Sequence, residues 1–176
     1  MTTRIEIPTL HTARLELRAF RADDLEDWAA IMADPEVRRF GASKDHSREA
    51  SWAMMERSLG QWALRGYGMF AFTTEGRLAG WAGILHPLDW PELELAYALA
   101  PAFWGKGLAS EAVEAARDWA FATIRPRRLA SFIAPANQHS IRVAERVGAV
   151  KEGLIELRGS KSEHWVHYPQ GRGPVV

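Results

Sequence analysis

A glycine turn between a strand-like and a helix-like segment is the first feature of this chain whose residue types and spacing suggest chemistry. The turn is Gly105-Lys106-Gly107; the apolar strand-like segment before it ends at Leu99, and helical spacing begins at Leu108. Glycine permits positive φ and lets the backbone approach a ligand closely. The free N–H groups in the first turn of a helix attract anions, so this turn is suited to binding a pyrophosphate.

Three phosphate ligands are candidates for this turn, beside the alternative that it only connects a strand to a helix. A nucleotide P-loop requires Ser or Thr after the lysine, but Gly107 stands there, which excludes it. A dinucleotide fingerprint would have Ser110 at its last position and the basic residues Arg127 and Arg128 where an acidic residue is expected. That pattern leaves open an NADP enzyme with one of these arginines on the 2′-phosphate. Coenzyme A is the third ligand.

Two sequence blocks that include or follow this turn resemble the GNAT N-acetyltransferases. The first, YALAPAFWGKGLASEA at residues 97–112, is similar to the acyl-CoA signature of that superfamily. The second is NQHSIRVAERVG at residues 137–148. The opening TARLELR at residues 12–18 fits the branch that includes the RimJ/RimL-type ribosomal-protein N-terminal acetyltransferases. The resemblance extends over about residues 9–168.

The resemblance implies an α/β (α+β) fold with a mixed, twisted sheet of about seven strands and flanking helices, splayed between the fourth and fifth strands. Acetyl-CoA would enter this splay as co-substrate, with its pyrophosphate on the backbone N–H groups of the glycine turn. Its pantetheine arm would pair with Leu99 and Ala100 and bond to Asn137. Trp104 departs from the superfamily pattern, which usually has Arg or Gln there. The acetyl-CoA contacts that the resemblance assigns are Leu99, Ala100, Trp104, Gly105, Lys106, Gly107, Leu108, Ala109, Ser110 and Asn137.

Acetyl transfer from a thioester to an amine needs a base for the amine, stabilisation of the oxyanion and a proton for the leaving thiolate. Glu94 is the candidate base, and Glu92 on the same strand face could replace it; the alternative is a glutamate that only faces solvent. Ser140 is the candidate proton donor to the thiolate, unless its hydroxyl bonds its own helix backbone. The oxyanion is expected on a backbone N–H near Ala98 or Leu99.

Apolar periodicity and turn residues predict the elements that must position these groups. Alternating residues predict strands at about 13–20, 68–74, 77–86, 92–99, 129–134, 151–158 and 163–168. Helical spacing predicts helices at about 23–34, 47–64, 108–121 and 137–148. The second helix has one face typical of a core-facing stripe, formed by Trp52, Met55, Leu59 and Trp62. Glu75-Gly76 is expected to form a hairpin turn.

The composition is that of one ordinary globular domain. Of 176 residues, 47% are hydrophobic and 25% charged, so residues 1–176 are expected to form a single domain with frayed ends at about 1–8 and 170–176. Basic and acidic residues number 22 each, which argues against a nucleic-acid partner, and no cysteine is present to act as a nucleophile. His164 and His167 would lie on opposite faces of a strand, so no metal site is predicted. No apolar run approaches the ~18 residues of a membrane span, and no signal peptide is evident, so a cytoplasmic location is expected.

Together these observations predict an acyl-CoA-dependent N-acetyltransferase. It would move an acetyl group from acetyl-CoA to a primary amine by direct attack in a ternary complex, as a monomer or homodimer. The acceptor could be a protein N-terminal amine or a small amine or amino-acid-like molecule. A CoA-binding regulatory module without turnover and an NADP-dependent enzyme remain as alternatives.

Overall fold

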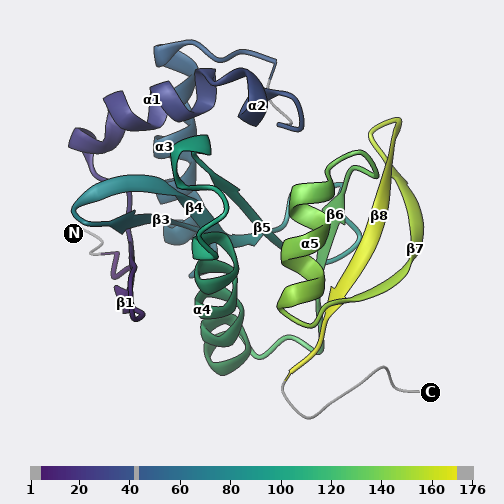
Figure 1. Cartoon of the computed structure of the whole chain (residues 1–176). Coiled ribbons are helices and arrows are strands. Elements are labelled where there is room, and N and C mark those ends of the chain that lie inside the picture. The colour runs from purple at the N-terminus through teal and green to yellow at the C-terminus, as the bar shows by residue number, and fades with distance from the viewer. Residues whose placement is uncertain (1–4, 42–43, 170–176) are drawn as a thin grey trace.

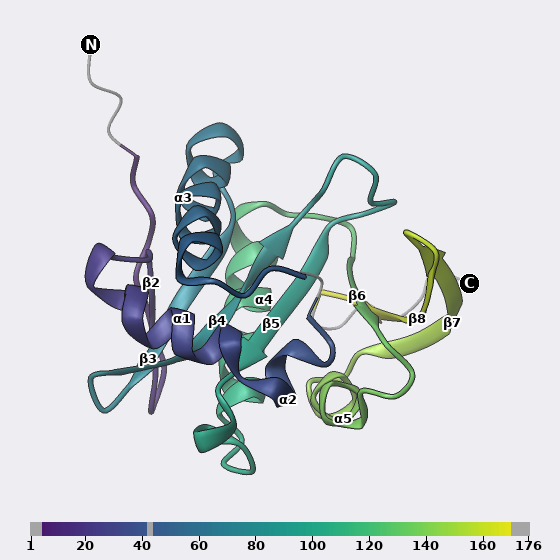
Figure 2. The same cartoon turned by 90° about the horizontal axis from the view of Figure 1, so that it is seen from above.

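The computed structural model describes residues 5–41 and 44–169 (Figure 1). Residues 1–4 and 170–176, which belong to the ends expected to be frayed, lie outside the described residues. Helices α1, α2 and α3 lie on the β1–β4 side of the molecule, whereas α5 and the β7–β8 hairpin lie on the β6 side (Figures 1 and 2). The region between these two sides, around β5 and β6, is therefore where both halves of the chain meet.

A single mixed sheet connects the two sides. Its strands are β1 Leu10–His11, β2 Glu16–Arg18, β3 Met69–Thr74, β4 Arg77–Leu85, β5 Glu94–Leu99, β6 Leu129–Ile133, β7 Val150–Leu157 and β8 Ser160–His167. Their order across the sheet is β1-β2-β3-β4-β5-β6-β8-β7, and every neighbouring pair is antiparallel except β5–β6. The predicted α/β class and mixed sheet are confirmed, with β1 as an eighth strand that the periodicity did not show.

The helices begin and end at residues that the sequence marks clearly. Their bounds are α1 Leu25–Ala33, α2 Pro35–Arg38, α3 Arg48–Arg65, α4 Leu108–Thr123 and α5 Gln138–Arg146, with 3₁₀ turns at Ala22–Asp24 and Pro101–Phe103. Ser47 caps α3 by accepting a hydrogen bond from the Ala50 N–H, and Gly66 ends this helix at φ +72°. The short helix α2 was not predicted; it forms because Asp34, which ends α1, also accepts a hydrogen bond from the Glu36 N–H.

The buried face of α3 differs from the predicted stripe. Met55 and Trp62 are buried as expected, but Trp52 is 39% exposed, and Ser51 and Ser58 lie on the buried face instead. Trp62 fixes this orientation, because its Nε1 donates to the Met69 carbonyl at 2.9 Å. A helical stripe read from apolar residues alone was therefore partly wrong.

The sheet opens between β5 and β6, which are the fourth and fifth predicted strands. Among the described residues these two strands share one ladder pair, Glu94 with Ala130, and the Ala130 N–H donates to the Leu93 carbonyl at 2.9 Å. One step further, the Ser131 hydroxyl donates to the Leu95 carbonyl at 2.6 Å, so a side chain takes the place of a ladder bond. Beyond this point the strands diverge (Figure 2). The predicted splay is confirmed.

Candidate active site

The glycine turn projects the N-terminus of α4 beside the splay. Gly105 and Gly107 both have φ +75°, a left-handed conformation that favours glycine, and Gly107 is the N-cap residue of α4. A Cβ on Gly105 would have no atom within 4 Å. The side chains of Leu108 and Ser110 are buried, so these residues would contact a ligand in the turn through their backbone. The turn therefore offers main-chain N–H groups in open space.

Two arginines from distant segments approach the same turn. A Cβ on Gly107 would lie 3.6 Å from Arg14 Nη2 and 3.9 Å from Arg146 Nη1. Arg14 precedes β2, and Arg146 is the last residue of α5. The sequence prediction named neither arginine as an acetyl-CoA contact. Arg146 places positive charge beside the free N–H groups of α4, whereas Arg14 is paired with Glu111, so the turn keeps a net positive charge suited to phosphate.

Arg14 also braces the turn through a network that starts from the N-terminal segment. Its Nη1 donates to the Lys106 carbonyl at 2.8 Å, and its Nε donates to Glu111 Oε2 at 2.7 Å. The Thr12 hydroxyl donates to Glu111 Oε1 at 2.6 Å. Burial alone raises the pKa of Glu111, but the hydrogen bonds from Thr12 and Arg14 outweigh it and lower that pKa. The Glu111 carboxylate at the start of α4 is thereby neutralised, so it does not repel a phosphate there.

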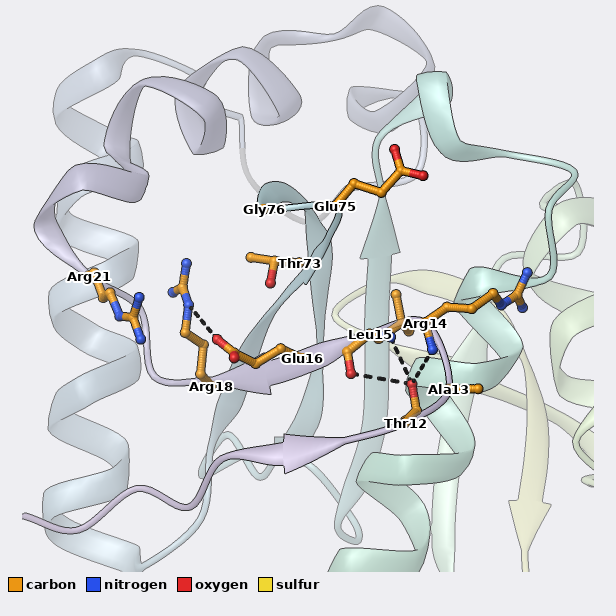
Figure 3. Close-up of a pocket in the computed structure, with 10 residues that line it drawn as sticks. All are labelled: Thr12, Ala13, Arg14, Leu15, Glu16, Arg18, Arg21, Thr73, Glu75 and Gly76. Carbon is orange, nitrogen blue, oxygen red and sulfur yellow. Dashed lines mark hydrogen bonds and ion pairs between the residues drawn. The ribbon is translucent and has the colours of Figure 1, made fainter.

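An open pocket lies on the N-terminal side of the glycine turn. It has a volume of about 380 Å³ and lies between the segment around β1 and β2 and the β3–β4 hairpin (Figure 3). Arg18 lines it but is held by Asp24, with both oxygens of that carboxylate accepting hydrogen bonds at 2.7 Å. None of the predicted site residues lines this pocket. It nevertheless shares Thr12 and Arg14 with the network that holds the glycine turn, so it lies on the N-terminal side of that turn.

The inner edge of β5 presents backbone groups to the splay. The Ala100 N–H donates to the Ala79 carbonyl of the β4 side at 2.8 Å, and alternate residues of an antiparallel strand point their backbone groups to opposite edges. Leu99 thus faces the splay, whereas Ala98 and Ala100 face β4. Trp104 Nε1 donates to the Leu99 carbonyl at 2.8 Å. Of the two residues expected near the oxyanion, Leu99 has the orientation that an oxyanion contact requires.

The first turn of α5 forms the opposite wall. Asn137 caps this helix, since its Oδ1 accepts from the Ser140 N–H at 3.2 Å. Among the described residues the Ser140 hydroxyl forms no hydrogen bond to its own helix backbone, and a side-chain hydrogen bond with Ser140 lowers the pKa of the Tyr97 phenol against the effect of burial. The His139 ring lies 4.9 Å from the Trp104 ring, centroid to centroid, which brings the glycine-turn side against α5.

Tyr97 reaches across the splay, and the sequence prediction missed it as a site residue. Its phenol donates to the Ser140 carbonyl at 3.0 Å, and burial raises the pKa of this phenol. The signal available in the sequence was its position on β5, two residues before Leu99 and on the same strand face. Tyr97 from β5 and Ser140 from α5 therefore bring two hydroxyl groups to the splay.

Glu94 lies at the closed end of the splay, where β5 and β6 still pair. Its Oε2 accepts a hydrogen bond from Trp90 Nε1 at 2.7 Å, and its carboxylate also accepts one from the Phe132 N–H. Burial raises the pKa of Glu94 to about 7, because the hydrogen bonds only partly offset the loss of water. A carboxyl group with this pKa can exchange a proton near neutral pH.

Glu92 precedes β5 and is already paired with the Arg128 guanidinium, with the His164 ring close by. Arg128 Nε lies 2.9 Å from its Oε2, and His164 Nε2 lies 2.8 Å from its Oε1. These contacts leave Glu94 as the less strongly paired of the two candidate bases. His167 is buried behind Ser131, with its Nε2 2.9 Å from the Ser131 hydroxyl, and does not face His164. The described residues contain no group of three or more His, Cys, Asp or Glu placed to hold a metal ion.

The fold and the splay with its glycine turn are those of an acyl-CoA-dependent acetyltransferase. Residues 14–150 match the family model described as "Acetyltransferase (GNAT) domain", and the chain belongs to this family. The general reaction of the family is acetyl transfer from acetyl-CoA to an amine. In the part of the chain that the structure describes, no helix is long and apolar enough to cross a membrane.

Relatives agree with this assignment over most of the chain. The chain is 26% identical over 151 residues to "Uncharacterized N-acetyltransferase p20" of Bacillus licheniformis, covering 84% of this chain and 85% of that protein. A crystal structure of an acetyltransferase from Agrobacterium tumefaciens matches with a TM-score of 0.82 and 30% identity, over 96% of this chain and 99% of that one. The ribosomal-protein-S5-alanine acetyltransferase of Vibrio fischeri, at 17% identity, matches with a TM-score of 0.77 over 96% of this chain and 100% of that one, which shows a shared fold.

Proposed function

We propose that this enzyme binds acetyl-CoA along the splay and acetylates a primary amine by direct attack, with Glu94 as the base. The observation that supports this proposal most strongly is the position of the half-buried Glu94 carboxyl at the closed end of the splay, where it accepts hydrogen bonds from Trp90 Nε1 and the Phe132 N–H and its pKa is raised to about 7. The glycine turn with Arg14 and Arg146 suits the phosphates of acetyl-CoA. Leu99 and Asn137 flank the path of the pantetheine arm.

The proposed steps balance protons and bonds without a covalent enzyme intermediate. Glu94 accepts a proton from the ammonium form of the acceptor, directly or through water, and the amine attacks the thioester carbonyl carbon. The Leu99 N–H stabilises the oxyanion while the C–N bond forms. As the C–S bond breaks, the Ser140 hydroxyl supplies a proton to the leaving thiolate, the nitrogen of the adduct loses its second proton to solvent to give the neutral amide, and Ser140 recovers its own proton from solvent. The Tyr97 phenol, bonded to the Ser140 carbonyl, keeps that helix turn in place.

The acceptor is proposed to be a protein N-terminal amine, with small amines as the competing class. The likeness to the fold of the Vibrio fischeri enzyme and the 12–18 segment support the RimJ/RimL-type branch. A thiol-release assay with acetyl-CoA against N-terminal peptides, amino acids, polyamines and aminoglycosides tests this choice. Turnover with peptides alone supports it, and turnover restricted to small amines contradicts it.

Replacing the base tests the mechanism. We expect Glu94→Gln to lower kcat about 10²–10⁴-fold with acetyl-CoA affinity nearly unchanged, because a positioned base contributes that much. In the wild type, kcat/KM should rise through about pH 7 as the Glu94 carboxylate forms, and this acid limb should vanish in the variant. Glu92→Gln is the matched control and should keep the limb. Acetyl-CoA binding without thiol release from any amine would instead favour a regulatory module, and a preference for NADP over CoA would contradict the proposal.

A further inference from the structure

The turn between β7 and β8 reaches back to the β4–β5 connection, next to the base. Arg158 Nε and Nη2 donate to Asp89 Oδ2 and Oδ1, each at 2.7 Å. The same guanidinium lies 4.5 Å from the centroid of the Trp90 ring. The Arg158 and Asp89 side chains are 58% and 52% exposed. An ion pair this exposed adds little to stability, but it holds the Arg158 guanidinium against the Trp90 ring.

Trp90 is the side chain that connects this ion pair to Glu94. Its Nε1 donates to Glu94 Oε2 at 2.7 Å. Its ring also packs edge-on against Phe132, with centroids 6.1 Å apart and planes at 86°. Arg158 and Phe132 therefore both contact the indole that donates to the carboxylate. A bond from a neutral N–H favours the charged form of the carboxylate without adding charge.

We propose that Trp90 and Arg158 are positioning residues for Glu94: Arg158 fixes the Trp90 indole, and the indole N–H holds the carboxylate in one orientation and favours its charged form. This inference rests on the proposed role of Glu94 as the base. It also implies that the β7–β8 hairpin influences proton transfer from outside the motif that binds acetyl-CoA. The contacts run from the hairpin turn to the β4–β5 connection and then to the first residue of β5.

The other charges around Glu94 are accounted for by their own partners. Arg158 acts on Glu94 electrostatically and lowers its pKa, in opposition to burial. Asp89 is paired with Arg158, and Glu92 is paired with Arg128 and His164. His164 lies beyond Phe132, with the two rings stacked at 5.4 Å. Replacing Trp90 by another aromatic residue therefore removes one neutral donor and leaves every charge in place.

The decisive variant is Trp90→Phe, which keeps an aromatic ring for Phe132 and Arg158 but lacks the N–H. We expect the acid limb of the kcat/KM profile to move up by about 1–2 pH units, the size expected for loss of a hydrogen bond to a charged group. Arg158→Gln should move it in the same direction by a smaller amount, because this guanidinium is exposed. Trp52→Phe, at an exposed tryptophan of α3, is the matched control and should leave the limb unchanged.

The outcomes separate this inference from the proposed function. The inference is supported if Glu94→Gln abolishes the acid limb of the kcat/KM profile, and if Trp90→Phe and Arg158→Gln both raise the apparent pKa of that limb while KM for acetyl-CoA stays unchanged. A limb that Glu94→Gln abolishes but that stays in place in both variants overturns the inference alone. A limb that survives in Glu94→Gln overturns the proposed base and the inference with it. If Trp90→Phe fails to fold, Arg158→Lys decides, because it keeps the positive charge that acts on Glu94 but lacks the planar guanidinium that contacts the Trp90 ring: a raised limb supports the inference, and an unmoved limb overturns it.

Discussion

Gly107→Ala tests whether the turn at the start of α4 binds the phosphates of acetyl-CoA. Alanine at φ +75° strains the backbone by about 1–2 kcal/mol, which corresponds to a fall in Tm of roughly 2–8 °C for a chain of this size. Its methyl group would make ordinary contacts at 3.6 Å from Arg14 and 3.9 Å from Arg146, so the fold should tolerate it. The same methyl group would occupy the space where a phosphate meets the turn.

The expected loss of affinity follows from the contacts that the methyl group blocks. Losing one charge-assisted hydrogen bond costs about 1.5–3 kcal/mol, or roughly 10- to 100-fold in Kd. Calorimetric titration with CoA measures this change. Gly76→Ala is the matched control, because Gly76 has φ +74° in the β3–β4 hairpin and a Cβ there would have nothing within 4 Å. Both variants should lose similar stability, but only Gly107→Ala should lose affinity. Unchanged affinity in folded Gly107→Ala, or equal losses in both variants, would refute the reasoning.

Three further predictions concern the brace, the leaving group and acid stability. Arg14→Ala should weaken CoA binding about tenfold, because the Lys106 carbonyl loses its donor and Glu111 is left unneutralised; adding Glu111→Gln should restore part of the affinity in the same titration. Ser140→Ala should lower kcat with acetyl-CoA affinity unchanged, and a thioester with a low-pKa leaving group should rescue it; equal defects with both donors would exclude Ser140 from catalysis. Burial lowers the pKa of His167 to about 4 from 6.5, so the unfolded state binds the proton first as pH falls. The free energy of unfolding should therefore drop by up to about 3 kcal/mol between pH 6.5 and 4, and His167→Gln should flatten this slope in urea titrations; an unchanged slope would contradict it.

The sequence predicted the elements well where local chemistry determines them. Ser47 begins α3 because its side chain caps the helix, and Glu75-Gly76 forms the β3–β4 turn with φ of +52° and +74°. These signals depend on a few neighbouring residues. The buried face of α3 does not depend on neighbouring residues alone. Trp52 and Ser51 are adjacent, and only packing in the folded protein decides which of them is covered. Apolar spacing favoured the tryptophan, and the fold placed the serine inside.

The candidate site shows the same division between local and long-range information. The glycine turn and Asn137 were visible because backbone conformation and helix capping are encoded locally. Tyr97 was missed because only the register of β5 against α5 brings its phenol to Ser140, 43 residues further along the chain. Arg14 was missed as a binding residue because its partner Glu111 is 97 residues away.

These long-range contacts form two separate sets, one around the glycine turn and one around Glu94. The Arg14 brace holds the glycine turn from the N-terminal side of the sheet, and the Arg158–Trp90 contact holds Glu94 from the β7–β8 hairpin. No described residue belongs to both sets of contacts. Residues that share no partner contribute independently to stability and binding. If both proposals hold, variants of the hairpin should change the acid limb of kcat/KM without changing CoA affinity, and variants of the glycine turn should change CoA affinity without moving the limb.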